Sequence, residues 1–148
     1  MPAKKTTPKK VNAGEPKIAF VVGDFNELLT KEMWRRAVLR AEELGYALGP
    51  TLHVAGTYDT PFAANELLRQ KDVAAVVVIA VIITGETKHD ELIAHATAKT
   101  LQELSLQYRK PVGLGITGPG QTYEQAEARI DRADAAVDAV HRILSQLG

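Results

Sequence analysis

The segment Gly85–Glu91, which reads Gly-Glu-Thr-Lys-His-Asp-Glu, combines residue types that could bind an anion and transfer a proton. It follows the apolar run Ala74–Ile83 and precedes a helical pattern that extends to Tyr108, so we expect a strand-to-helix turn. A helix N-terminus has unpaired N–H groups and partial positive charge, which suit an anion such as phosphate. The imidazole of His89 could move protons near neutral pH. Taken alone, the segment fits an ordinary helix cap with solvated charges better.

Strands and helices alternate along the rest of the chain. Compact apolar runs predict strands at Ile18–Val22, Leu52–Val54, Ala74–Ile83 and Pro111–Ile116. Helical patterns run from Asn26 or Thr30 to Leu44, from Pro61 to Leu68, from Lys88 to Tyr108, and from Thr122 to Leu147 with a break near Ile130 and Asp131. The connections are too long for hairpins. We therefore expect an α/β fold, a three-layer sandwich with a four-stranded parallel sheet in the order 2-1-3-4, which is a flavodoxin-like arrangement.

Four loops are predicted to gather at one edge of this sheet. Ligands of parallel sheets bind beyond the carboxyl ends of the strands. Those ends lead into the segments Gly23–Asn26, Ala55–Asp59, Gly85–His89 and Thr117–Gln121. Together the loops hold an aromatic ring, an amide, a carboxylate, an imidazole and Gly-rich turns. This convergence is stronger evidence for a binding site than any single loop.

Composition limits the possible functions. The length of 148 residues fits one domain, which we place at residues 17–148 after a flexible basic tail at residues 1–16. Basic and acidic residues balance at 18 each, which argues against general binding to nucleic acid or to an acidic membrane. The chain has no cysteine, no apolar run that could span a bilayer and no signal-peptide pattern, so we expect a cytoplasmic protein.

The sequence lacks the usual signatures of nucleophilic, nucleotide and metal chemistry. We find no Ser-His-Asp order, nucleophile elbow, dinucleotide fingerprint or Walker motif. His89 and His95 are six residues apart and point about 240° apart on a helix, so they do not form a paired metal motif. His53 and His141 are expected to be structural. We therefore expect no metal and no cofactor, but an anion-binding turn, one candidate acid/base and an apolar slot.

Several motifs occur in order along Ile18–Leu147: Phe25-Asn26-Glu27 with Thr30, Gly56–Pro61, Gly85–Glu91, Lys110-Pro111-Val112, and Glu124-Gln125-Ala126 with Arg129. Together they resemble the 6,7-dimethyl-8-ribityllumazine synthase family of riboflavin biosynthesis, in its archaeal style. This resemblance implies a transferase that joins 5-amino-6-(D-ribitylamino)uracil to 3,4-dihydroxy-2-butanone 4-phosphate and releases phosphate. It also implies self-association as a pentamer or a 60-subunit icosahedral shell, with the site between neighbouring subunits.

The resemblance assigns a role to each matched residue. The implied substrate-binding residues are Phe25, Asn26, Gly56, Thr57, Tyr58, Asp59, Ile82, Ile83, Gly85, Glu86, Thr87, Leu114 and Arg129. Phe25 would stack on the pyrimidine, with Ile82 and Ile83 bordering the ring. Tyr58 and Asp59 would hold the ribityl chain.

The remaining implied roles concern the phosphate and the proton. Backbone N–H groups of Gly85, Glu86 and Thr87 would face the phosphate, with which Arg129 would pair through its guanidinium. His89 is the implied catalytic residue, and Leu114 would close the slot from a neighbouring subunit.

The sequence departs from the family pattern in several places. Asp59 occupies a position where bacterial members usually have Glu, and Thr84 one where Arg or Lys commonly precedes the Gly. The Gly-Asn-Lys loop of bacterial members is absent. Two other functions therefore stay open: a structural subunit of a pentamer or shell, natural or engineered, with weak or no catalysis, and a flavin or pterin binder without turnover.

Overall fold

One parallel sheet forms the centre of the molecule. The computed structural model describes residues 15–85 and 89–147, and its strands are β1 (Lys17–Gly23), β2 (Ala47–Val54), β3 (Val73–Val81) and β4 (Val112–Thr117). All three neighbouring pairs are parallel, in the order β2-β1-β3-β4. The predicted fold class and strand order are confirmed.

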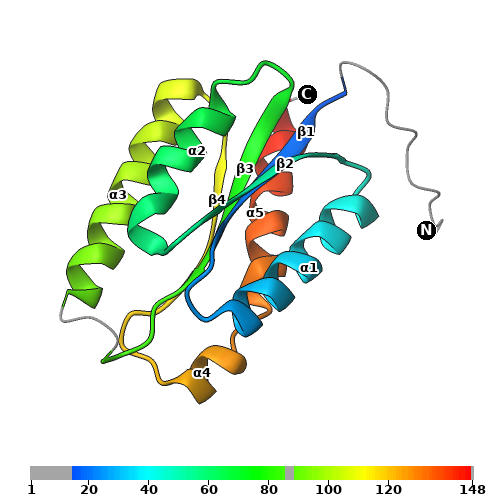
Figure 1. The fold of residues 1–148 in the computed structure, drawn as a ribbon. Coiled ribbons are helices and arrows are strands. Elements are labelled where there is room, and N and C mark those ends of the chain that lie inside the picture. Colours follow the sequence, from blue (N-terminus) through cyan, green and yellow to red (C-terminus); the bar gives the residue numbers. More distant parts are fainter. Residues whose placement is uncertain (1–14, 86–88, 148) are drawn as a thin grey trace.

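Helices cover both faces of the sheet (Figure 1). They are α1 (Glu27–Glu43), α2 (Thr60–Leu68), α3 (Asp90–Tyr108), α4 (Tyr123–Glu127) and α5 (Arg132–Leu147), with a short 3₁₀ turn, η1 (Thr57–Asp59), before α2. Helices α1 and α5 pack together on one face, and α2 and α3 pack on the other. The result is the expected three-layer sandwich, with the predicted interruption of the last helix lying between α4 and α5.

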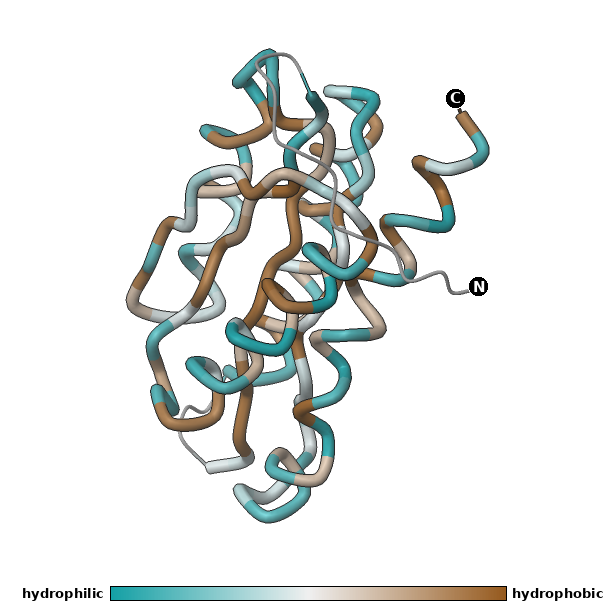
Figure 2. The backbone as a smooth tube through the Cα atoms, turned by 90° about the vertical axis from the view of Figure 1, so that its right-hand side faces the viewer, coloured by the Kyte–Doolittle hydropathy of each residue, from teal (hydrophilic) through white to brown (hydrophobic). Residues whose placement is uncertain are grey.

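The core consists of two apolar clusters, one on each face of the sheet. Ile18 and Phe20 of β1 belong to the cluster under α1 and α5, whereas Ala19 and Val21 belong to the cluster under α2 and α3. The central strands are hydrophobic over most of their length (Figure 2). Side chains alternate between the faces of a strand, so a strand covered on both faces reads as one continuous apolar run. This explains why β1 and β3 were predictable from the sequence.

The edge strand β2 is longer than predicted. It begins at Ala47 instead of Leu52, and it contains Gly49 and Pro50. The pairing register with β1 shifts between Ile18 and Phe20, opposite this Gly-Pro pair. Proline lacks an N–H group, but an edge strand can accommodate it at an irregularity of this kind. The Gly-Pro pair therefore favoured a loop in the sequence, although the strand continues through it.

Helix α3 also differs from the prediction. It begins at Asp90, two residues after the predicted start. Within this helix, Ala96 is exposed and the neighbouring Thr97 is buried. Ala96 precedes Leu101 by five residues, which corresponds to about 140° around the helix, whereas Thr97 precedes it by one turn. None of the helices in the described ranges is both long and apolar enough to cross a membrane.

Candidate functional site

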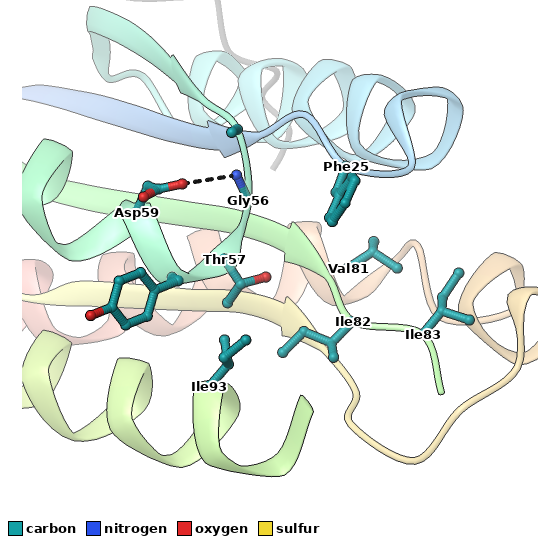
Figure 3. A pocket seen from close by; sticks show the side chains of 10 residues that line it. Phe25, Gly56, Thr57, Asp59, Val81, Ile82, Ile83 and Ile93 are labelled. Carbon is teal, nitrogen blue, oxygen red and sulfur yellow. Dashed lines mark hydrogen bonds between the residues drawn. The ribbon is translucent and has the colours of Figure 1, made fainter. Parts of the chain in front are cut away.

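A cavity of about 290 Å³ lies where β1 and β3 end (Figure 3). Its lining residues are Phe25, Ala55, Gly56, Thr57, Tyr58, Asp59, Val81, Ile82, Ile83 and Ile93. In the strand order β2-β1-β3-β4, the connections run in opposite directions from β1 and β3. Open parallel sheets bind their ligands at this switch point.

The cavity opens because the sheet divides beyond the strand ends. On one side, the N–H groups of Asp24 and Phe25 donate to the carbonyls of Val54 and Ala55 over 2.8 and 3.0 Å. These bonds extend the pairing of β1 with β2 past the end of β1.

On the other side, the N–H of Ile82 donates to the carbonyl of Thr117 over 2.9 Å, and that of Thr84 donates to the carbonyl of Gln121 over 2.8 Å. The pairing of β3 with β4 thus also continues. Among the described residues, no backbone hydrogen bond joins residues 24–25 to residues 82–84. The two extended pairs therefore separate, and the space between them is the cavity.

The start of α1 presents the ring of Phe25. Asn26, at the N-cap, has a left-handed conformation with φ of 63°, and its carbonyl accepts the N–H groups of Leu29 and Thr30. The Phe25 ring lies beside the cavity (Figure 3) and is 63% exposed. An aromatic face that is this accessible can stack on a flat ligand ring.

Asp59 fixes the turn that forms the opposite rim. Its Oδ2 accepts the N–H of Gly56 at 3.3 Å, and its own N–H donates to the Gly56 carbonyl. The Oγ1 of Thr60 donates to the carbonyl of Thr57 at 2.8 Å, and Pro61 lies in the first turn of α2. Asp59 occupies the N-cap position of α2, but its carboxylate caps η1 and makes no side-chain cap bond to α2.

The structure describes only part of the predicted anion-binding turn, Gly85–Glu91. Gly85 has a φ of 93°, which is a left-handed conformation that favours glycine, as expected of a tight turn. The predicted phosphate contacts at Glu86 and Thr87 lie outside the described residues. His89 is exposed at the N-cap of α3, and its carbonyl accepts the N–H of Ile93, a residue that lines the cavity.

Arg129 and Leu114 do not line the cavity. Arg129 lies between α4 and α5, where its Nη1 donates to Oε1 of Gln121 at 2.9 Å. Leu114, on edge strand β4, is 47% exposed and lines a groove with Leu101 and Ile143. This groove is distinct from the cavity.

The structure thus gathers about half of the predicted site residues. Seven line one cavity: Phe25, Gly56, Thr57, Tyr58, Asp59, Ile82 and Ile83. Among the other described ones, Asn26, Gly85, His89, Leu114 and Arg129 are not in its lining. The sequence analysis missed Ala55, Val81 and Ile93. Ile93 follows His89 by one helical turn, and this spacing could have identified it as a residue near the site.

Two of the other histidines, His53 and His141, have side-chain hydrogen-bond partners. His53 Nδ1 lies 2.9 Å from Oδ1 of Asp24, and His141 Nδ1 lies 2.7 Å from the hydroxyl of Tyr46. Burial raises the pKa of Tyr46, so its phenol stays protonated at neutral pH. Within the described part of the chain, no three His, Asp or Glu residues are placed to bind a metal ion.

The fold is that of a doubly wound α/β protein, and its cavity lies at the strand switch point, where such folds bind small molecules. The family model described as 6,7-dimethyl-8-ribityllumazine synthase matches residues 15–147. The chain belongs to this family.

Proteins with the same description are similar along most of the chain. That of Staphylothermus marinus is 45% identical, with 88% of this chain and 87% of the relative aligned. The relative from Methanococcus aeolicus is 43% identical over 88% and 96%, and that from Halobacterium salinarum is 39% identical over 88% and 98%. These relatives confirm the predicted archaeal style.

Proposed function

We propose that this chain condenses 5-amino-6-(D-ribitylamino)uracil with 3,4-dihydroxy-2-butanone 4-phosphate to 6,7-dimethyl-8-ribityllumazine, with release of phosphate. The family match over residues 15–147 carries this proposal. The match spans both halves of the cavity, so the whole site belongs to the matched region.

The cavity has walls that suit the pyrimidine substrate. Phe25 lies on one side, and Ile82 and Ile83 lie on the side formed by the end of β3 (Figure 3). A flat ring between an aromatic face and aliphatic side chains loses contact with water on both faces. The rim formed by Gly56 and Asp59 supplies polar groups for a hydroxylated ribityl chain.

The reaction itself needs few protein groups. The 5-amino group of the pyrimidine attacks the ketone, and the carbonyl oxygen leaves as water. Elimination of phosphate then gives an enol that becomes a second carbonyl. The ribitylamino nitrogen attacks this carbonyl and closes the ring with loss of a second water. Both reacting groups are already active, so holding them together provides much of the acceleration. In this proposal His89 transfers the protons, since it lies one turn before the cavity residue Ile93.

The phosphate of the ketone binds in this proposal at the turn containing Gly85. The adjacent Thr84 is uncharged, so the positive charge must come from elsewhere. Arg129 is the candidate, because its partner Gln121 also accepts the N–H of Thr84. A guanidinium matches the geometry of phosphate oxygens.

Exposed apolar side chains support assembly into a ring. One group, near the cavity, contains Phe25, Leu28, Tyr58 and Phe62, and another, toward edge strand β4, contains Leu106, Leu114, Ile143 and Leu147. Two unlike patches on the same chain fit a head-to-tail contact, which closes into a ring. We propose a pentamer, alone or within a 60-subunit shell, in which Leu114 of one subunit covers the cavity of the next.

Measurements of turnover and of the number of subunits test the catalytic proposal and the ring proposal separately. Purified protein mixed with both substrates should form the lumazine, seen by its absorbance, with one phosphate released for each product molecule. Sedimentation should show at least five subunits, and Leu114→Asp should reduce this number. Assembly without product would overturn the catalytic proposal and favour a structural subunit, whereas an active monomer would overturn the ring.

A further inference from the structure

Gln121 lies at the centre of a hydrogen-bond network that joins three parts of the site. Its side chain is buried, with 1% exposed. Its Nε2 donates to the carbonyl of Ile82 at 3.2 Å and to Oγ1 of Thr117 at 2.9 Å. Its Oε1 accepts from Nη1 of Arg129 at 2.9 Å, and its backbone carbonyl accepts the N–H of Thr84 at 2.8 Å.

These partners allow only one orientation of the amide. The carbonyl of Ile82 can only accept a hydrogen bond, so it requires the NH₂ group. The guanidinium of Arg129 can only donate, so it requires the oxygen. Turning the amide over would lose both bonds inside a buried site, where unpaired polar groups are costly.

Gln121 is neutral, so it does not compensate the positive charge of Arg129. The amide oxygen fixes the guanidinium by one hydrogen bond and contributes no negative charge. No carboxylate in the described ranges forms an ion pair with Arg129. A glutamate at 121 would pair with Arg129 and compete with any anion, and it would also place a carboxylate near the carbonyl of Ile82.

The same network holds the wall of the cavity. Ile82 lines the cavity, and Thr84 directly precedes Gly85. The loop containing Gly118 lies against this segment so closely that a Cβ at Gly118 would be 2.2 Å from the carbonyl oxygen of Ile82. Gln121 therefore connects Ile82 and Arg129 through its buried side-chain amide, and Thr84 through its backbone carbonyl.

We propose that Gln121 is a positioning residue, which holds the guanidinium of Arg129 in register with the Ile82–Thr84 segment so that the phosphate of the ketone substrate is bound. The inference rests on the proposed function for the identity of that anion. Gln121 itself need not touch either substrate.

Steady-state kinetics of two Gln121 variants test this role. Gln121→Glu should raise the KM for the butanone phosphate about tenfold or more, because the new carboxylate occupies Arg129. The KM for the pyrimidine should change less than about threefold. Gln121→Met keeps the size of the side chain but removes its hydrogen bonds, and it should shift the same KM in the same direction. Gln107→Glu and Gln107→Met, at an exposed position of α3, control for added charge and lost amide.

A double-variant experiment separates positioning from general structural damage. If Gln121 acts through Arg129, then Gln121→Glu made in the Arg129→Ala background should leave the KM for the butanone phosphate nearly unchanged. An equally large increase in both backgrounds would overturn the proposal. Equal increases in the two KM values, or no increase, would overturn it as well.

Two further measurements keep this result distinct from the proposed function. The thermal midpoint of each variant shows whether it folds. If Gln121→Glu does not fold, the kinetics of Gln121→Met test the proposal. If the wild-type protein forms no lumazine, the proposed function fails. Calorimetric titration with inorganic phosphate then tests Gln121 alone: weaker binding to Gln121→Glu than to the wild type supports the positioning role, and equal binding overturns it.

Discussion

The two sides of the cavity are built differently. On the β1/β2 side, backbone hydrogen bonds place Phe25 and Gly56 at the rim of the cavity, and the aromatic rings of Phe25 and Tyr58 are exposed. On the β3/β4 side, the buried amide of Gln121 joins Ile82 to the Arg129 side chain. The β1/β2 side thus offers an exposed aromatic face, whereas the β3/β4 side combines the aliphatic side chains of Ile82 and Ile83 with a fixed set of polar contacts.

This difference suggests how a protein can bind two unlike substrates without a cofactor. An apolar face binds a flat ring with little dependence on precise geometry, since the hydrophobic effect is non-directional. Binding an anion requires donors at fixed positions and a charge that no internal partner cancels. We therefore expect substitutions of Phe25 to affect mainly the pyrimidine and substitutions of Arg129 to affect mainly the butanone phosphate.

The largest effect should come from filling the close approach between Gly118 and Ile82. Gly118→Ala should destabilise the protein by about 3 kcal/mol or more, because its φ is 96° and its Cβ would overlap a carbonyl. Gly120→Ala is the matched control, since its φ is also left-handed, at 79°, but nothing lies within 4 Å of its Cβ. It should cost only about 1–2 kcal/mol.

Thermal unfolding at a fixed protein concentration measures both variants. The midpoint should fall several degrees further for Gly118→Ala than for Gly120→Ala, at about 2–4 °C for each kcal/mol in a chain of this length. Equal shifts would mean that the loop does not depend on the contact with Ile82.

The second effect concerns turnover. His89→Ala should lower kcat by about 100-fold at most, which is the lower end of the usual range for general acid–base catalysis. Positioning of an already reactive amine and ketone remains in the variant. His95→Ala, also on the exposed surface of α3, is the control. An unchanged kcat would show that His89 is an ordinary residue at the start of a helix.

The fold was largely predictable because its strands are buried on both faces. β1 and β3 appear as uninterrupted apolar runs, and these runs lead into the loops that hold the site. Thr122 and Gln125 form a capping box at the start of α4, where the sequence pattern predicts that a helix begins. The missed part of β2 contains Gly49 and Pro50, where local turn chemistry pointed to a loop although pairing with β1 maintains the strand.

The lining of the cavity was predictable where short motifs mark it along the chain, as at Phe25 and Gly56–Asp59. Gly56–Asp59 forms a compact turn, and the sequence motif identifies it directly. Gln121 was assigned to a loop by composition, because its role depends on contacts with Ile82 and Arg129, which are distant or separated by a helix. Such contacts leave no periodic signal in one sequence.

The third effect should separate the two substrates. Arg129→Ala should weaken binding of the butanone phosphate by about 2 kcal/mol, as expected for the loss of a charged hydrogen-bonding partner. Binding of the pyrimidine should change little, because that substrate has no phosphate. Arg132→Ala, on the exposed start of α5, removes an equal charge as a control. Titrations that show equal losses for both ligands would contradict the assigned role.

The smallest effect should appear on the β1/β2 side and concern the other substrate. Phe25→Ala should weaken pyrimidine binding by about 1 kcal/mol, since aromatic pairs contribute about 0.5–1.5 kcal/mol beyond the area they bury. Tyr123→Ala is the control, because Tyr123 is an exposed aromatic residue that neither lines the cavity nor belongs to the proposed ring contact.

Phe25→Leu provides the finer comparison. Leucine retains apolar contact but has no aromatic face, so it should recover only part of the loss seen with alanine. Full recovery would mean that Phe25 acts by burial alone, in which case the two sides of the cavity would differ in polarity but not in aromatic recognition. If Phe25→Ala instead weakened binding of the butanone phosphate most, the division of the cavity between two substrates would be wrong.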